Sequence, residues 1–116
     1  MNNIIMNAHA TDNAGGAYIT GESTLLKDNK FVNTSSGQVG GAIQLKTNNS
    51  IIMNNEFTSS FANTSGGVAY FEGENITITH NNFTNNHANN LGGAIRWNSG
   101  NESAGKVTEN RFEDNY

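Results

Sequence analysis

The chain of 116 residues contains no cysteine and no proline. The absence of cysteine excludes a disulfide scaffold and thiolate metal sites. Charged residues make up only 14% of the sequence, well below the roughly 25% of an ordinary soluble domain, and the formal net charge is −4. This mildly acidic balance excludes the basic surface that nucleic acids and anionic membranes attract, so we expect no nucleic-acid partner.

Long hydrophobic runs are missing as well. No stretch approaches the roughly 18 apolar residues of a membrane span, so we expect no membrane insertion by this segment. The first twenty residues lack the basic and apolar regions of a secretion signal. Asparagine, in contrast, is abundant: the chain has 22 Asn, together with 20 Ser or Thr. Such a composition is typical of disordered tracts, but here the Asn residues recur at fixed positions.

The sequence is an internal repeat, marked by glycine pairs spaced by 25, 26 and 26 residues. Nine residues before each pair stands a bulky apolar residue, and Asn stands two residues before most of these. The pairs are Gly15-Gly16, Gly40-Gly41, Gly66-Gly67 and Gly92-Gly93. The apolar series is Met6, Phe31, Phe57 and Phe83, and Phe112 continues it after a three-residue insertion within 98–104. The column before it is Ile4, Asn29, Asn55, Asn81 and Asn110.

Each unit reads as short strands joined by turns. Residues 76–79 alternate Ile and Thr with the period of a strand, a second segment holds the Phe, and a third follows the glycine pair. No unit has the apolar spacing of a helix. Three short strands in about 26 residues predict an all-β fold, a parallel β-helix of about four rungs. Crossover handedness favours the right-handed form.

Stacking of the coils gives each column a physical role. In a solenoid, equivalent positions lie above one another at about 4.8 Å. The Phe column therefore predicts an internal aromatic stack, and the Asn column predicts an amide ladder whose residues also tolerate positive φ at a bend. A second internal column of aliphatic residues is expected at Leu26, Ile52, Ile78 and Val107. The glycine pairs predict corners where a Cβ would clash or φ is positive.

We expect residues 1–116 to form a single β-helix domain. Terminal coils of a solenoid need polar or helical caps, and no cap is recognisable at either end of the sequence. We therefore expect this domain to be a fragment of a longer array, in which neighbouring rungs of the full-length chain cover the end rungs.

The combination of Gly-Gly-Ala-Ile with Phe-x-x-Asn in one repeat resembles the polymorphic outer-membrane proteins of Chlamydia and other bacteria. The first motif is complete at Gly40-Gly41-Ala42-Ile43 and Gly92-Gly93-Ala94-Ile95. The second is complete from Phe83 to Asn86 and from Phe112 to Asn115. The resemblance implies a right-handed β-helix passenger of the autotransporter type, exposed at the cell surface, that adheres to host cells. The signal peptide and membrane barrel of that family are not in this sequence.

Residues for catalysis or metal binding are sparse, and we expect no enzyme activity and no cofactor. Catalytic β-helices need acids clustered with Lys or Arg on one face, whereas Asp12, Asp28 and Asp114 fall in different columns. Glu72 and Glu74 lie close together, but a solvated edge is the simpler interpretation. The histidines His9, His80 and His87 do not share a column and have no third ligand nearby, so exposed turn residues are favoured over a metal site.

The best candidate for a ligand face follows the third and fourth glycine pairs. Tyr70 and Arg96 form one column there, and Phe71 and Trp97 form the next. Strand alternation directs one column inward and the other outward. An outward Tyr70 and Arg96 would offer stacking and hydrogen bonding to sugars, and an outward Trp97 a stronger platform. Burial of Phe71 and Trp97 behind Leu45 is favoured, because three large apolar residues in one column are typical of a core.

Three functions of different classes remain open. The leading hypothesis is a non-catalytic surface adhesin or autotransporter-passenger segment whose partner is a host-cell or matrix protein or glycan. The second is a non-catalytic portion of a polysaccharide lyase or hydrolase, and the third is a purely structural spacer. Extracellular or cell-surface localisation follows from the first hypothesis. Glycosylation sequons occur at Asn33, Asn48, Asn63, Asn75, Asn82 and Asn101 and are expected by chance in this composition.

Overall fold

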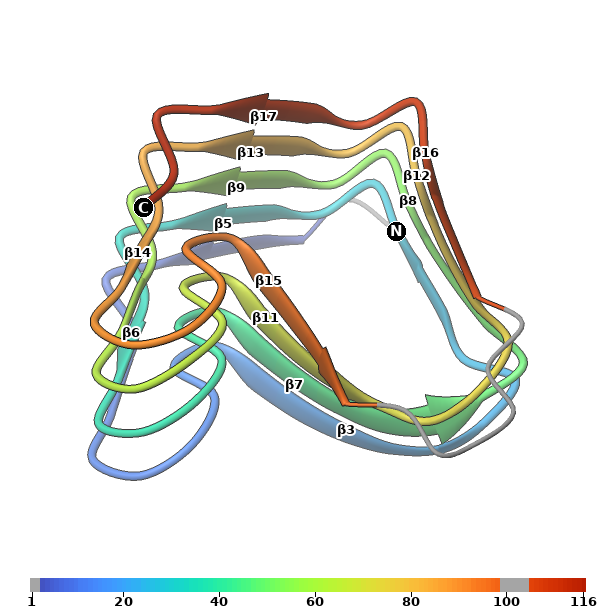
Figure 1. Ribbon diagram of the computed structural model, residues 1–116, viewed down its shortest axis with the longest axis horizontal. Coiled ribbons are helices and arrows are strands. Elements are labelled where there is room, and N and C mark those ends of the chain that lie inside the picture. The colour runs from blue at the N-terminus through green and yellow to red at the C-terminus, as the bar shows by residue number, and fades with distance from the viewer. Residues whose placement is uncertain (1–2, 99–104) are drawn as a thin grey trace.

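The computed structural model describes residues 3–98 and 105–116, and in these ranges the chain is a solenoid of parallel strands without helices (Figure 1). The strands form four sheets, which we name A to D in the order in which one coil visits them. Sheet A contains β1 (Ile4–Met6), β5 (Lys30–Val32), β9 (Glu56–Thr58), β13 (Asn82–Thr84) and β17 (Arg111–Glu113). Sheet B contains β2 (His9–Ala10), β6 (Ser35–Ser36), β10 (Phe61–Ala62) and β14 (His87–Ala88). Sheet C contains β3 (Ala17–Glu22), β7 (Ile43–Asn48), β11 (Ala69–Glu72) and β15 (Ile95–Asn98). Sheet D contains β4 (Leu25–Lys27), β8 (Ser50–Met53), β12 (Ile76–Thr79) and β16 (Lys106–Thr108).

Every strand pairs in parallel with its equivalent in the next coil. Phe31 pairs with Phe57 and Phe57 with Phe83, which is a register of 26 residues. Between the last two coils the register lengthens to 29 residues, as in the pair Phe83 and Phe112. The coils wind in a right-handed sense (Figure 1). The predicted β-helix of about four rungs is therefore confirmed, while residues 99–104, which hold most of the predicted insertion and the sequon at Asn101, lie outside the described residues.

Each coil contains four strands, not the three that the sequence predicts. The additional strand is the two-residue strand of sheet B, such as Ser35–Ser36 in β6. It follows the Phe-bearing strand of sheet A after a bend of only two residues. A strand of two residues is too short for period-two alternation, and the residues Ser-Ser favour a turn as much as a strand. The sequence therefore gives no signal for it.

The interior is built from the predicted columns. The rings of Phe31, Phe57 and Phe83 are at most 1% exposed, and their centroids lie 5.0 and 5.2 Å apart in nearly parallel planes. Phe112 extends the stack at 4.7 Å and is 48% exposed because it lies in the last coil. The aliphatic column is in register from Leu26 to Val107, and its central members Ile52 and Ile78 are fully buried. These contacts supply most of the apolar burial that stabilises the fold.

The predicted asparagine ladder runs beside the Phe stack. The Asn55 Oδ1 atom accepts hydrogen bonds from the Asn29 backbone N–H at 2.9 Å and from the Asn29 side-chain amide at 3.1 Å. Asn55 donates in the same way to Asn81, and Asn81 to Asn110. Because Asn29, Asn55 and Asn81 are buried, these bonds satisfy polar groups that would otherwise cost free energy to bury.

The ladder residues do not take the positive φ that the sequence analysis assigned to them. Positive φ occurs one residue earlier, at Asp28, Asn54, His80 and Glu109. This residue makes the bend between sheets D and A with its side chain in solvent, whereas the following Asn keeps extended backbone and turns its amide into the ladder. Bend and ladder are therefore separate roles on neighbouring residues.

The glycine pairs are corners, and the two glycines serve different purposes. Gly40, Gly66 and Gly92, the first of each pair, have φ between 66° and 67°, a conformation that a side chain disfavours. The second glycine approaches the adjacent coil, so that a Cβ on Gly67 would collide with the backbone carbonyl of Gly93. Both predicted reasons for the glycine pairs are confirmed, one for each glycine.

The first coil is offset by one residue from the register predicted by its glycine pair. Ala14, with a φ of 54°, takes the role of Gly40, and Gly15 takes that of Gly41. The predicted members Met6, Ile4 and Thr20 are consequently wrong by one position. The residues in the columns are Ile5 opposite Phe31, Asn3 bonded to Asn29, and Ile19 opposite Leu45. Ala accepts the left-handed conformation at moderate cost, so the motif shifted while the fold kept its period of 26.

Candidate ligand-binding face on sheet C

The candidate ligand residues lie on the solvent side of sheet C, which forms the lower layer in Figure 1. Strand alternation places two columns on this side, and we call them together the outer face of sheet C. The first column consists of Tyr18, Gln44, Tyr70 and Arg96. The second, two residues further along each strand, consists of Thr20, Lys46, Glu72 and Asn98. The face is therefore aromatic and polar, and it changes residue type at each coil.

Tyr70 and Arg96 point outward as the sugar-binding hypothesis requires. The Arg96 guanidinium carbon lies 5.9 Å from the centroid of the Tyr70 ring, and Nη1 donates a hydrogen bond of 3.1 Å to the Ser65 hydroxyl. The cation covers one side of the ring. That side is unavailable for stacking a sugar, so the pair offers its N–H and O–H groups more than an aromatic surface.

Trp97 is not part of this face. It lies in the inward column with Leu45 and Phe71, where it meets Phe71 edge to face at 6.3 Å. Its indole N–H donates to the Gly73 carbonyl at 3.1 Å, and its ring passes so close to Gly105 that a Cβ there would collide with it. The interpretation of Trp97 as core is confirmed, and its place on the candidate ligand face is corrected.

The second column is linked by charge. The Lys46 ammonium lies 3.7 Å from the Glu72 carboxylate, which raises the pKa of Lys46 above its usual 10.5, and Tyr18 contributes to the same shift. Asn98 donates to the Tyr70 hydroxyl at 3.4 Å. The solvated-edge interpretation of Glu72 agrees with this arrangement, since its partner is a lysine on the next strand.

Gln44 is the residue of this face that the sequence did not single out. It lies between Tyr18 and Tyr70 in the same column, yet it is only 4% exposed. Its side-chain oxygen is buried and accepts no hydrogen bond. A buried acceptor without a donor is unusual in folded proteins. Nothing in the periodicity signals it, because an outward glutamine in a strand is normally solvated.

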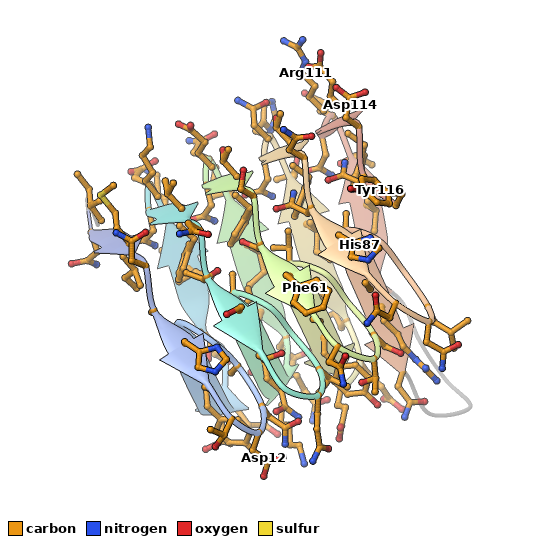
Figure 2. All side chains as sticks on the ribbon, turned by 90° about the vertical axis from the view of Figure 1, so that its left-hand side faces the viewer. Asp12, Phe61, His87, Arg111, Asp114 and Tyr116 are labelled. Carbon is orange, nitrogen blue, oxygen red and sulfur yellow. The ribbon has the colours of Figure 1, made fainter. Side chains whose placement is uncertain are left out.

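A second row of rings lies on the outside of sheet B, where Figure 2 shows Phe61, His87 and Tyr116 in succession. The Phe61 and His87 rings stack at 5.4 Å, and His87 and Tyr116 lie 4.5 Å apart with tilted planes. His9 belongs to the same column, paired through Ser35. The statement that the histidines do not share a column is thus wrong for His9 and His87, because it used the offset register of the first coil.

The remaining candidates for chemistry stay apart. Asp12, Asp28 and Asp114 lie in three different columns, as expected. The imidazole of His80 contacts the Glu109 carboxylate at 2.6 Å, and both side chains are exposed. Within the described ranges no group of three or more His, Asp or Glu side chains is placed to hold a metal ion.

The residues of the resembling motifs have structural places. Ala42 and Ile43 are fully buried, and Asn86 is a rung of a second amide ladder in which it donates to Asn115 at 2.8 Å. Of the sequons, Asn33, Asn63, Asn75 and Asn82 are exposed and Asn48 is half-buried.

Comparison of the chain with protein-family models, with curated proteins and with solved structures gave no match. Among residues 3–98 and 105–116 there is also no helix that is long and apolar enough to cross a membrane.

Proposed function

We propose that this β-solenoid is a non-catalytic binding segment of the adhesin or autotransporter-passenger type. It belongs to a longer protein displayed at the cell surface, and it adheres to a host-cell or matrix glycan or protein. The motif pair that resembles the polymorphic outer-membrane proteins supports this assignment. The observation that carries it is the outer face of sheet C, where Tyr18, Tyr70 and Arg96 present hydrogen-bonding and aromatic groups at successive coils.

A rigid ladder is well suited to such a face. The backbone of sheet C is held by parallel pairing over the full length of β7 and β11, so the side chains that it carries are ordered before a ligand arrives. Preorganisation reduces the entropy lost on binding. Equivalent positions recur at about 4.8 Å along the axis, which lets an extended polymer meet one group per coil.

The test is adhesion of the purified chain to cultured cells and to immobilised matrix proteins and glycans. We expect binding by the wild-type chain and its loss in Tyr70→Ala. The matched control is Phe61→Ala, which removes a ring from sheet B and leaves sheet C unchanged; it should bind as the wild type does. Absence of wild-type binding to every surface would contradict the proposal and favour a structural spacer. Equal loss in both variants would contradict the assignment to sheet C.

A further inference from the structure

Arg96 is held in one orientation by its surroundings. Nη1 donates to the Ser65 hydroxyl at 3.1 Å, and the guanidinium carbon lies 5.9 Å from the Tyr70 ring centroid. Arginine normally loses considerable rotamer freedom when it binds a ligand. Here a hydroxyl and a ring already restrict the side chain, and its remaining N–H donors are not used by any described hydrogen bond.

The charge of Arg96 is not neutralised within the described part of the chain. Other cations of the surface have acidic partners: Lys30 pairs with Glu56 at 3.3 Å, and Arg111 with Glu113 at 2.6 Å. On sheet C, Lys46 pairs with Glu72. Arg96 contacts a hydroxyl and an aromatic ring instead. An ordered guanidinium without a carboxylate is complementary to a carboxylate or sulfate, which it can bind through paired N–H donors.

The neighbours of Arg96 have the chemistry that hydroxyl-rich ligands require. The Tyr70 hydroxyl and the Asn98 amide lie together at 3.4 Å and can exchange donor and acceptor roles with a sugar. The buried Gln44 oxygen, one coil away, accepts no hydrogen bond, a deficit that a ligand hydroxyl entering between the tyrosines would correct. Tyr18 lies two coils from Tyr70, roughly 9.6 Å along the axis, a span that a disaccharide can cover.

We propose that Arg96 is an anion-binding subsite on the outer face of sheet C and that the ligand of this face is an acidic glycan. A carboxylate or sulfate of the glycan docks on the Arg96 guanidinium, and its hydroxyl groups bond to Tyr70, Asn98 and Gln44. This inference rests on the proposed binding function and names the ligand chemistry of the same face. It favours a glycan over an acidic peptide because amide and phenol groups, rather than apolar pockets, surround the cation.

The experiment is calorimetric titration of the chain with hyaluronan oligosaccharides, which carry carboxylates, and with chondroitin sulfate oligosaccharides, which add sulfates. Methyl-esterified hyaluronan has the same backbone without the charge. We expect the wild-type chain to bind the acidic forms and to lose about tenfold in affinity for the ester, the effect of one charge-assisted hydrogen-bonded pair. A preference for one acidic form over the other identifies carboxylate or sulfate as the docking group.

Two substitutions assign the effect to the residue. Arg96→Gln should lose about tenfold for the acidic glycans and leave binding of the ester unchanged, and Arg96→Lys should retain part of the affinity because it keeps the charge but not the planar fork. Arg111→Gln makes the same change of charge on sheet A and should have no effect. The urea midpoint of each variant establishes that it is folded.

Several outcomes would overturn the inference. Equal loss in Arg96→Gln and Arg111→Gln would mean attraction by overall charge, and equal affinity for hyaluronan and its ester would mean that the face does not read charge. Binding of poly-glutamate as tight as that of hyaluronan would replace the glycan with an acidic peptide. Neutral glycans bound through Tyr70 alone would contradict the anion subsite and leave the proposed binding function intact, whereas no adhesion to any surface would contradict both.

Discussion

Removal of one ring from the internal stack provides the sharpest quantitative test of the fold. Phe57 is fully buried, and its ring lies between Phe31 and Phe83 at centroid distances of 5.0 and 5.2 Å. Phe57→Ala leaves a cavity that the neighbouring coils cannot close, because their spacing is fixed by the backbone ladders. Buried Phe→Ala changes cost about 3–5 kcal/mol, and the loss of two stacked neighbours favours the upper half, about 4 kcal/mol.

The assay is equilibrium unfolding in urea, followed by circular dichroism. With a dependence of about 2 kcal/mol per molar urea for a domain of this size, the midpoint should fall by about 2 M. Because small domains have only about 5–15 kcal/mol of stability, the variant should be folded only marginally. The matched control is Phe61→Ala, whose ring stacks with His87 on the outside of sheet B, and which should cost about 1 kcal/mol. A midpoint shift in Phe57→Ala no larger than that of Phe61→Ala would refute the internal aromatic stack.

Three further predictions concern the ladder, the corner and the ion pair. Asn55→Leu should cost about 3 kcal/mol in urea unfolding, because it leaves buried amide groups of the preceding coil unpaired, whereas Leu at the exposed Asn82 should change stability by less than about 0.5 kcal/mol; similar losses would contradict the ladder. Gly67→Ala should lower the melting temperature by several degrees, about 1–3 kcal/mol, since the new Cβ collides with backbone, and an unchanged melting temperature would contradict the corner. Glu72→Gln should lower the pKa of Lys46 toward 10.5 in an NMR titration, because Glu72 is the largest cause of its rise. The contribution of this exposed pair is present at neutral pH and is lost as the pH rises through the raised pKa; an unchanged titration would contradict the pairing.

Much of the fold could be predicted because stacking repeats the same physical demand in every coil. The column from Phe31 to Phe112 must be large and apolar, and Asn29, Asn55 and Asn81 must carry amides of one length, so the sequence shows these positions directly. Where the demand can be met in two ways, the pattern misleads. Ala14 adopts the positive φ that Gly40 adopts in the next coil, and the first glycine pair therefore indicated a register that is one residue off.

The candidate site was predicted only as far as strand alternation reaches. Alternation places Tyr70 and Arg96 on one side of β11 and β15 and Trp97 on the other, as observed. The contact of Arg96 with the Tyr70 ring depends on side-chain rotamers, and the burial of Gln44 depends on what covers it from neighbouring coils. Neither is written in the spacing of residues. The row of Phe61 and His87 was missed because it lies on the short strands that the sequence does not signal.

The most direct measurement of the central claim is an NMR titration of the isotope-labelled chain with hyaluronan oligosaccharides. If the outer face of sheet C is the ligand face, the signals that shift first will be the Arg96 guanidinium, the Gln44 side-chain amide and the backbone amides of Tyr18 and Tyr70. Signals of Phe61 on sheet B will stay in place. Shifts confined to sheet B, or a spectrum unchanged at saturating oligosaccharide, would contradict the account.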